Sequence, residues 1–286
     1  MVDQWKSLVA GATAGAIEGV ITYPFEFAKT RLQLVSKASN QSKNPLKLIY
    51  NVAKADGIGA LYAGCIPAVA GNTLKAGVRF LAFDAIKDLL RDKDGNISKA
   101  RGALAGLGAG VLESVIALTP AESIKTAFID DRQRANPRYN KGFIRGVSLL
   151  VKDNGVGALY RGVVPVTLRQ ASNQFVRLGS YNAIKSLVQE RKPDPSAPLS
   201  STETFAIGAL VGTITVYTTM PVDTLKTRMQ GVEAKQQYSG SIDCVKKIVQ
   251  NEGVLTLWRG STARLGRLIL SGGIVFTIYE KIMTVL

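Results

Sequence analysis

The hydrophobic positions along the chain form three similar blocks of about one hundred residues. Each block has a long apolar stretch, a polar segment, a short amphipathic stretch such as residues 46–55, and a second long apolar stretch. Apolar runs of this length and period are typical of helices rather than strands. The pattern therefore predicts an all-α chain with six long and three short helices, in repeats 1–98, 99–196 and 197–286 that together form one domain.

Three sets of landmarks recur in register and define these repeats. A proline that precedes an acidic residue by two positions and a lysine by five stands at Pro24, Pro120 and Pro221. An aromatic residue lies two positions before each of Gly64, Gly162 and Gly260, which are spaced by 98 residues. A further aromatic landmark has the same spacing at Phe83, Tyr181 and Tyr279. The prolines are 96 and 101 residues apart, close to the 98 residues of the other two landmarks. Because three separate features agree on a spacing of about one hundred residues, the repeat is not a coincidence of composition.

The first long stretch of each repeat carries glycines at four-residue spacing, the pattern that lets helices approach closely in lipid. These glycines are Gly11, Gly15 and Gly19, then Gly102, Gly106 and Gly110, then Gly208 and Gly212. Residues 204–222 form an uncharged span of 19 residues, whereas Glu18, Glu113, Lys75 and Arg79 interrupt other stretches. Ionisable residues on membrane helices face a bundle interior or an aqueous cavity, because exposing them to lipid is costly. We therefore expect a membrane protein with six transmembrane helices around a water-accessible path.

The composition favours an anionic partner and argues against an enzyme. The chain has 36 Lys and Arg, 21 Asp and Glu and no His, which gives a formal charge of +15. Without His the commonest general base and metal ligand is missing, so we assign no catalytic and no metal-binding residue. Cys65 and Cys244 lie far apart and are expected to be reduced and structural. The formal charges of the polar segments inside the repeats sum to +6, and those of the segments between repeats sum to +1. This difference indicates that both termini lie on the less positive side.

A charge of +15 is also compatible with a soluble, basic helical-repeat protein that binds nucleic acid. That alternative predicts cations on an outer face and extraction without detergent. The uncharged span and the glycine-rich helices oppose it, so we expect no nucleic-acid partner.

The recurring motifs resemble those of a known family. The threefold P-x-[DE]-x-x-[KR] repeat, with aromatic-[DE]-x-x-[KR] motifs on the even-numbered helices, is similar to the mitochondrial carrier family over essentially the whole chain. Residues 22–33, 71–80 and 264–273 are most similar to its members that carry tricarboxylates. The resemblance implies a six-helix bundle with threefold pseudosymmetry in the mitochondrial inner membrane, with short amphipathic helices on the matrix side and both termini toward the intermembrane space. The internal pseudosymmetry indicates a functional monomer, and no cofactor is expected.

The resemblance also implies a gate on each face of the bundle. The matrix gate joins each acid of the proline motif to a lysine of another repeat: Glu26 with Lys125, Glu122 with Lys226, and Asp223 with Lys29. Gln33 and Gln230 occupy its brace positions, and Ile129 stands at the third. The cytoplasmic gate pairs Asp84 with Lys185 and Glu280 with Lys87, with Tyr181 and Tyr279 as braces. Its third pair is missing, because Asn182 and Met283 stand there.

Positions that break the threefold pattern identify candidate substrate residues, since a small asymmetric anion cannot make three identical contacts. Positions seven, eleven and fifteen residues after Gly64, Gly162 and Gly260 share one helical face. This cation face consists of Lys75, Arg79, Arg169, Arg177 and Arg267, and Gln170 lies beside it. Arginine offers bidentate geometry to a carboxylate, so a ligand with two or three carboxylates suits the set. Anchoring to lipid headgroups is the alternative.

Three further ionisable residues have more than one interpretation. Arg264 fits a headgroup anchor better than the cation face, although it can also line the matrix-side entrance of the cavity. Glu18 and Glu113 either neutralise cavity cations, take up a proton that accompanies the substrate, or bond helices together.

Glycines at helix starts are candidate lipid sites. Gly162 and Gly260 follow an arginine at the predicted beginning of a helix, where backbone amides can bind a phosphate. The resemblance makes this lipid cardiolipin, with Gly142 and Gly240 as partners; ordinary helix capping is the alternative. Ala63 replaces the arginine in the first repeat, which weakens the expected site there.

The pattern, the cation face and the resemblance together predict an antiporter. We expect it to exchange citrate or a related tricarboxylate for another di- or tricarboxylate, such as malate, by alternating access. A dicarboxylate or oxodicarboxylate carrier of the same family is the alternative.

Overall fold

The computed structural model describes residues 4–34, 44–91, 98–134, 136–140, 142–192 and 199–285 of the 286-residue chain. Every regular element in these ranges is helical. The six long segments are α1 (Gln4–Leu34), α3 (Cys65–Leu90), α4 (Lys99–Glu113) continued through η2 (Ser114–Leu118) and α5 (Thr119–Asp131), α7 (Val163–Glu190), α8 (Ser201–Met229) and α11 (Ser261–Val285). The short elements are α2 (Pro45–Asp56), α6 (Phe143–Asn154), α9 (Ala234–Gln237), α10 (Ser241–Glu252), and the 3₁₀ turns η1 (Ile58–Tyr62), η3 (Val156–Tyr160) and η4 (Val254–Trp258).

Local sequence signals explain where several helices begin. Asn44 caps α2, since its side chain accepts hydrogen bonds from the amides of Leu46 and Lys47. Ser200 and Glu203 form a reciprocal capping box at the start of α8. These caps satisfy amide groups that the first turn of a helix leaves without partners.

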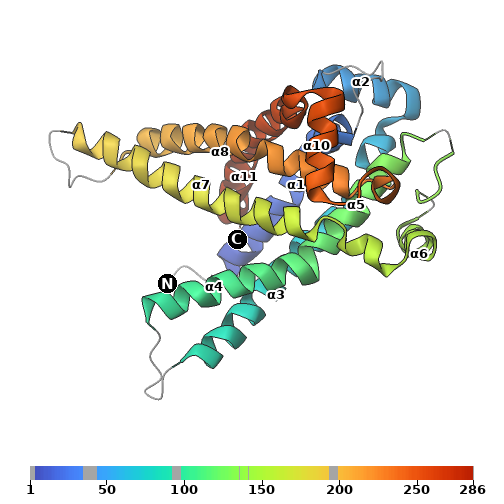
Figure 1. Ribbon diagram of the computed structural model, residues 1–286. Helices are drawn as coiled ribbons and strands as arrows, with labels where there is room; N and C mark the ends of the chain where they lie inside the picture. Colours follow the sequence, from blue (N-terminus) through green and yellow to red (C-terminus); the bar gives the residue numbers. More distant parts are fainter. Residues whose placement is uncertain are drawn as a thin grey trace.

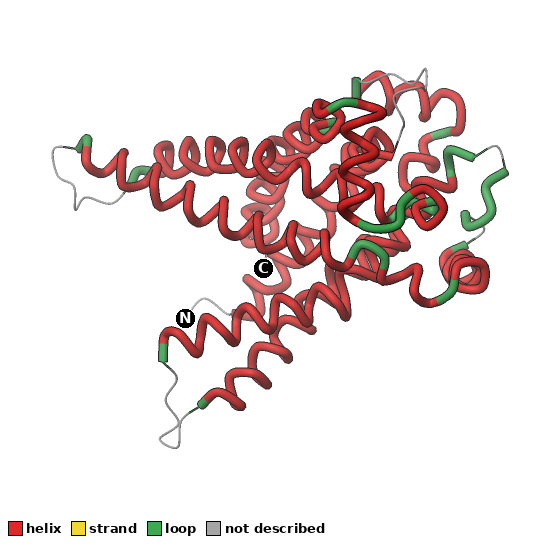
Figure 2. The backbone as a smooth tube through the Cα atoms, viewed as in Figure 1, coloured by secondary structure: helices red, strands yellow, loops and turns green. Residues whose placement is uncertain are grey.

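The long helices pack in three close pairs, each joining helices from two different repeats. The pairs are α1 with α11, α3 with α4, and α7 with α8. Figure 1 shows the α3/α4 and α7/α8 pairs diverging toward the ends that carry the inter-repeat connections, and converging where α2, α6 and α10 lie. The same shape is clear in the backbone trace of Figure 2, in which every regular segment is helical. We call the two ends of the bundle the open end and the closed end.

Polarity is reversed relative to a water-soluble protein. Large apolar side chains point outward along the long helices, with Phe80, Phe175 and Phe205 between 72% and 82% exposed, whereas Glu113 and Asp223 are almost fully buried. Two segments, Leu104–Asp131 and Thr202–Met229, are long and apolar enough to cross a membrane by composition alone. Of the charges that interrupt the apolar stretches, Glu113 lies within the first of these segments and is buried. Glu18 of α1 and Lys75 and Arg79 of α3 line an internal cavity.

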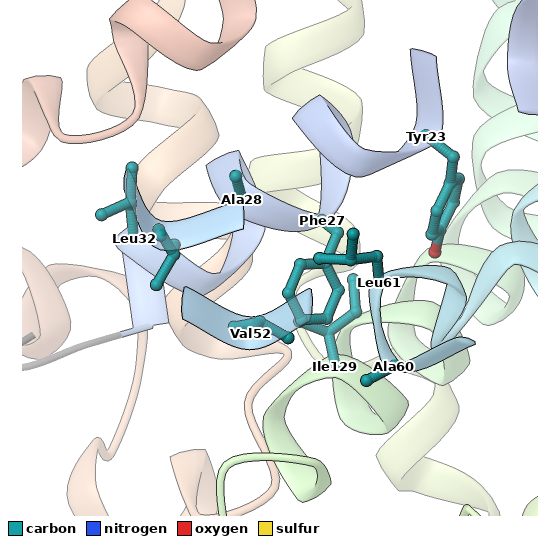
Figure 3. Close-up of a cluster of buried hydrophobic side chains, with 9 residues drawn as sticks. Tyr23, Phe27, Ala28, Leu32, Val52, Ala60, Leu61 and Ile129 are labelled. Carbon is teal, nitrogen blue, oxygen red and sulfur yellow. The ribbon is translucent and has the colours of Figure 1, made fainter. Parts of the chain in front are cut away.

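An apolar cluster fastens the first repeat to the second at the closed end (Figure 3). Phe27 of α1 lies between Val52 of α2 and Leu61 of η1, and Ile129 of α5 reaches in from the second repeat. Phe27 and Ile129 are fully buried. Ile129, which stands at the third brace position, therefore contributes apolar packing rather than a hydrogen bond.

Pro221 lies inside α8, where its ring leaves the carbonyl of Tyr217 without a helical amide donor. The indole Nε1 of Trp258, the last residue of η4, donates a hydrogen bond to this carbonyl at 2.9 Å. A backbone carbonyl left unpaired in an apolar environment is costly, so Trp258 offsets the effect of the proline.

Replacing Trp258 by Phe is expected to lower the free energy of unfolding by about 1–2 kcal/mol, because the ring stays while the donor is lost. Tyr160 has the equivalent place in η3, and its hydroxyl has no hydrogen-bond partner among the residues that the structure describes. Tyr160→Phe is therefore the matched control. Thermal unfolding in detergent measures both variants, and equal shifts would contradict the assigned role of Trp258.

Cys244 of α10 is fully buried in an apolar cluster with Leu225, Ile248 and Leu257. Burial raises the pKa of its thiol from 9.0 to about 12, because the thiolate loses its hydration. The thiol therefore stays protonated at neutral pH, as the structural role expected from the sequence requires.

In a Cys65→Ser variant, Cys244 is the sole thiol of the chain. We expect the folded protein to resist maleimide labelling at about pH 8, since the thiolate is the reactive form, and to be labelled fully in SDS. The unfolded thiol ionises above its ordinary pKa of 9.0 while the folded thiol stays protonated, so this residue favours unfolding as the pH rises beyond 9.0. Mass spectrometry follows the labelling, and rapid reaction of the folded protein would exclude this environment.

Candidate functional site

A cavity of about 880 Å³ lies between the long helices. All five residues of the cation face and Gln170 line it. These six residues lie on α3, α7 and α11, which we call the wall helices; residues of α1, α5 and α8 also line the cavity. The residues selected by their spacing from the glycine landmarks are thus brought together around one space.

The glycine landmarks fix where the three wall helices begin. Gly64, Gly162 and Gly260 have left-handed φ values of 79°, 77° and 85°, which side chains with a Cβ rarely adopt. A Cβ on Gly64 would lie 2.8 Å from the carbonyl oxygen of Lys125, and one on Gly260 would lie 3.1 Å from that of Lys29. Each landmark therefore turns the chain into the wall helix and allows close contact with the next repeat.

Three buried ion pairs form the floor of the cavity at the closed end. Nζ of Lys125 lies 2.7 Å from Oε1 of Glu26, and Nζ of Lys226 lies 2.7 Å from Oε1 of Glu122. Lys29 pairs with Asp223. The pairs join the first repeat to the second, the second to the third, and the third to the first, which is the arrangement expected of the matrix gate.

One of the two predicted braces is present. Gln33 donates to Oδ2 of Asp223 at 3.2 Å and accepts a hydrogen bond from Thr227 at 2.8 Å. Gln230 differs from the expectation, because its Oε1 accepts a hydrogen bond from Thr126 and its Nε2 has no partner in the described part of the chain. Thr126 lies on α5 one helical turn after Glu122. Gln230 therefore contacts α5 and not the ion pair between Glu122 and Lys226.

Two arginines of the cation face are bound to acids of the matrix gate. Nη2 of Arg169 donates to Oε1 of Glu122 at 3.1 Å, and Nε of Arg169 lies 3.6 Å from Oδ1 of Asp223. Nη1 of Arg267 donates to Oε2 of Glu26 at 2.8 Å. The floor and the wall of the cavity therefore share one charge network.

The first repeat has no arginine at the corresponding position. Gly71 lies there, and a Cβ on it would come 2.3 Å from Cβ of Ala121. Helix α3 approaches α5 too closely for a side chain, so this corner of the cavity floor is built from backbone and small residues.

Glu113 and Glu18 neutralise cations of the cavity, one of the interpretations left open by the sequence. Glu113 lies 3.6 Å from Nζ of Lys75 and 3.4 Å from Nη1 of Arg79. Oε1 of Glu18 lies 3.8 Å from Nη2 of Arg267. Both carboxylates are buried at helix interfaces.

Arg264 also lines the cavity, which is the second of its two interpretations in the sequence analysis. Its guanidinium donates to Thr219 of α8 at 3.0 Å and to Asn173 of α7 at 3.1 Å, which joins α11 to both helices. Its spacing of four residues from Gly260 continues the same helical face as Arg267 toward the floor, and this signal was available in the sequence.

The residues of the cytoplasmic gate are not joined at the open end. Among the described side chains, neither Asp84 with Lys185 nor Lys87 with an acid forms an ion pair, and Asp84 is exposed. Tyr181 lines the cavity. The side chains of Tyr279 and Glu280 lie outside the described residues. The bundle is therefore closed at the end with the three ion pairs and open at the other end.

The glycines proposed as lipid sites lie at helix starts. Gly142, Gly162, Gly240 and Gly260 immediately precede α6, α7, α10 and α11. At Gly142, Gly162 and Gly240 no side chain caps the following helix. Arg259, beside Gly260, also pairs with Glu252 at 3.3 Å.

Comparison with known proteins agrees with this geometry. The family described as mitochondrial carrier protein matches residues 2–94, 96–192 and 197–286. The chain belongs to the mitochondrial carrier family. It is therefore a carrier and not an enzyme.

Several relatives of this carrier have names that state a substrate. The tricarboxylate transport protein of Saccharomyces cerevisiae is 58% identical over 100% of this chain and 97% of its own length. Mitochondrial citrate transporter B of Aspergillus niger is 46% identical over 98% of this chain and 92% of its own length. The mitochondrial tricarboxylate transport protein of Rattus norvegicus is 36% identical over 98% of this chain and 89% of its own length.

Gln33 and Gln230 give a matched test of the brace in this carrier. Gln33→Leu is expected to lower the free energy of unfolding by about 2–3 kcal/mol, because it leaves a buried carboxylate and a hydroxyl short of partners. Gln230→Leu removes one hydrogen bond and is expected to cost about 1 kcal/mol or less. Thermal unfolding in detergent compares them, and a larger loss for Gln230→Leu would mean that the brace is assigned to the wrong residue.

Proposed function

We propose that this protein is a mitochondrial inner-membrane antiporter that exchanges citrate or a related tricarboxylate for a di- or tricarboxylate such as malate. The observation that carries the proposal is the cavity, whose lining includes nine Lys and Arg side chains but only three carboxylates, Glu18, Glu26 and Glu122. Counting Glu113 and Asp223, which pair with lining lysines, the cations still outnumber the carboxylates by nine to five. Such an excess of buried positive charge is unfavourable until an anion binds. The names of the relatives support tricarboxylates as that anion.

The shared charge network supplies a coupling between substrate and gate. A substrate carboxylate that binds Arg169 or Arg267 competes with Glu122, Asp223 and Glu26 for the same guanidinium groups. Binding therefore weakens the matrix gate, because its acids lose part of their partners. A ligand shifts a conformational equilibrium only through unequal affinity for the two states, and this competition provides the inequality.

Closure of the open end completes the proposed cycle. Asp84 with Lys185, and Glu280 with Lys87, form the cytoplasmic gate when the three helix pairs converge there. The bound anion favours this movement, since it attracts Lys75, Arg79 and Arg177 toward the axis. Exchange rather than one-way transport follows if the empty cavity, with its unbalanced cations, does not make the transition.

The surroundings of the carrier are proposals of the same kind. The closed end faces the matrix and both termini face the intermembrane space, in agreement with the charge of the connecting segments. Gly142, Gly162, Gly240 and Gly260 bind cardiolipin phosphates at helix starts. The functional unit is a monomer, with repeats 1–98, 99–196 and 197–286.

Transport by purified protein in cardiolipin-containing liposomes tests the substrate. Uptake of labelled citrate is measured with internal citrate, malate, 2-oxoglutarate, phosphate or no anion. The proposal expects uptake only against internal citrate or malate. Absence of citrate uptake, together with rapid dicarboxylate or oxodicarboxylate exchange, would replace the tricarboxylate assignment by the alternative within the family.

Arg169→Ala and Arg267→Ala test the cation face in the same assay. We expect each to reduce citrate exchange by at least about a hundredfold, since a lost bidentate contact to a carboxylate costs about 3 kcal/mol. Lys54→Ala, on the exposed side of α2, is the control for a lost surface charge. Wild-type exchange in both arginine variants would remove these residues from the site.

A further inference from the structure

The first long helix of the second repeat contains one irregular turn. Residues Ser114–Leu118 form a π-helical turn between α4 and α5, closed by a hydrogen bond from the backbone amide of Thr119 to the carbonyl of Ser114. Thr119 Oγ1 donates to the same carbonyl at 2.6 Å. In the described parts of α1 and α8, the equivalent stretches are regular α-helix. A π turn accommodates one extra residue in a helix.

Glycine positions show that the π turn absorbs a one-residue insertion. Gly15 and Gly212 lie nine residues before Pro24 and Pro221, whereas Gly110 lies ten residues before Pro120. The preceding glycines follow the same rule, at 13, 13 and 14 residues: Gly11, Gly208 and Gly106. Upstream of the turn, equivalent positions are therefore displaced by one residue in the second repeat.

The corrected register makes Glu18, Glu113 and Thr215 equivalent. Glu18 and Thr215 lie six residues before their prolines and Glu113 lies seven before its own. All three side chains are buried, with exposures of 9%, 1% and 9%. Two of the three equivalent positions thus carry a carboxylate, and the third carries a neutral hydroxyl.

Each of these positions lies on a helix that is paired with a wall helix. Glu113 of α4 meets Lys75 and Arg79 of α3 at 3.6 and 3.4 Å. Glu18 of α1 meets Arg267 of α11 at 3.8 Å. The carboxylates therefore reduce the positive charge that two wall helices present to the cavity.

The third pair, α8 with α7, lacks this compensation. Thr215 Oγ1 donates to the carbonyl of Val211 at 2.7 Å and carries no charge. The positions of α7 that correspond to Lys75 and Arg79 are Asn173 and Arg177, each 98 residues further along the chain. Within the described residues, no carboxylate lies at ion-pair distance from Arg177.

We infer that the neutral side chain at position 215 determines the charge of the anion that the cavity prefers. A carboxylate at each of the three equivalent positions would compensate every wall helix. Thr215 instead leaves Arg177 available to pair with the ligand. The anion that the cavity prefers therefore carries one more negative charge. This inference rests on the proposed function, because it accounts for a preference for tricarboxylates over dicarboxylates.

Thr215→Glu tests the inference, with Thr215→Gln as the control of the same size and no charge. KM values for citrate and malate are measured in the liposome exchange assay at neutral pH. Relative to Thr215→Gln, the Glu variant is expected to raise the KM for citrate about tenfold more than that for malate, because Coulomb repulsion grows with ligand charge. Equal citrate-to-malate KM ratios in the two variants would overturn the inference.

Glu18→Gln gives the opposite test if the Thr215 variants do not fold. It removes one compensating charge while keeping the Oε1 acceptor for the Thr22 hydroxyl. The citrate-to-malate KM ratio is expected to fall several-fold, and an unchanged or higher ratio contradicts the inference. If the wild-type protein exchanges only dicarboxylates, the proposed substrate is wrong, whereas a higher malate KM in Thr215→Glu than in Thr215→Gln still supports the effect of charge at this position.

Discussion

Three buried ion pairs form a ring at the closed end, between Glu26 and Lys125, Glu122 and Lys226, and Asp223 and Lys29. Each pair joins one repeat to another, so the first long helices of the three repeats, which end as α1, α5 and α8, converge there. The opposite ends of the bundle are held apart. Removing one partner of a buried pair leaves an uncompensated charge, at a cost of about 3–5 kcal/mol. The same ring that closes one end of the bundle therefore creates the cavity above it and makes that cavity accessible from the other side.

Function in a threefold scaffold depends on departures from the threefold pattern. At one level of the cavity the three repeats present Gly71, Arg169 and Arg267, because the close contact between α3 and α5 excludes a side chain from the first. Both arginines also contact gate acids. An asymmetric anion can thus be held by unequal contacts while the backbone that moves around it remains nearly symmetric.

In a membrane the usual distribution of polarity is reversed, with apolar side chains outside and charged side chains inside. Each internal charge therefore needs a partner. Apolar side chains such as Phe80 and Phe175 lie on the outside of the bundle, where lipid would make a charged side chain costly. The cations therefore gather around the axis, where resident carboxylates compensate some of them. The hydrogen bond from Trp258 to the carbonyl freed by Pro221 follows the same requirement for the backbone.

Helical periodicity and residue spacing are local properties of the chain, and they were enough to predict the three repeats, the helices and the face on which the cations lie. Contacts between distant helices could not be predicted in this way: Gln230 accepts a hydrogen bond from Thr126, Arg264 joins three helices, and the ion pairs close one end of the bundle while the other end is open. These outcomes depend on distances between helices far apart in the chain, which periodicity does not encode.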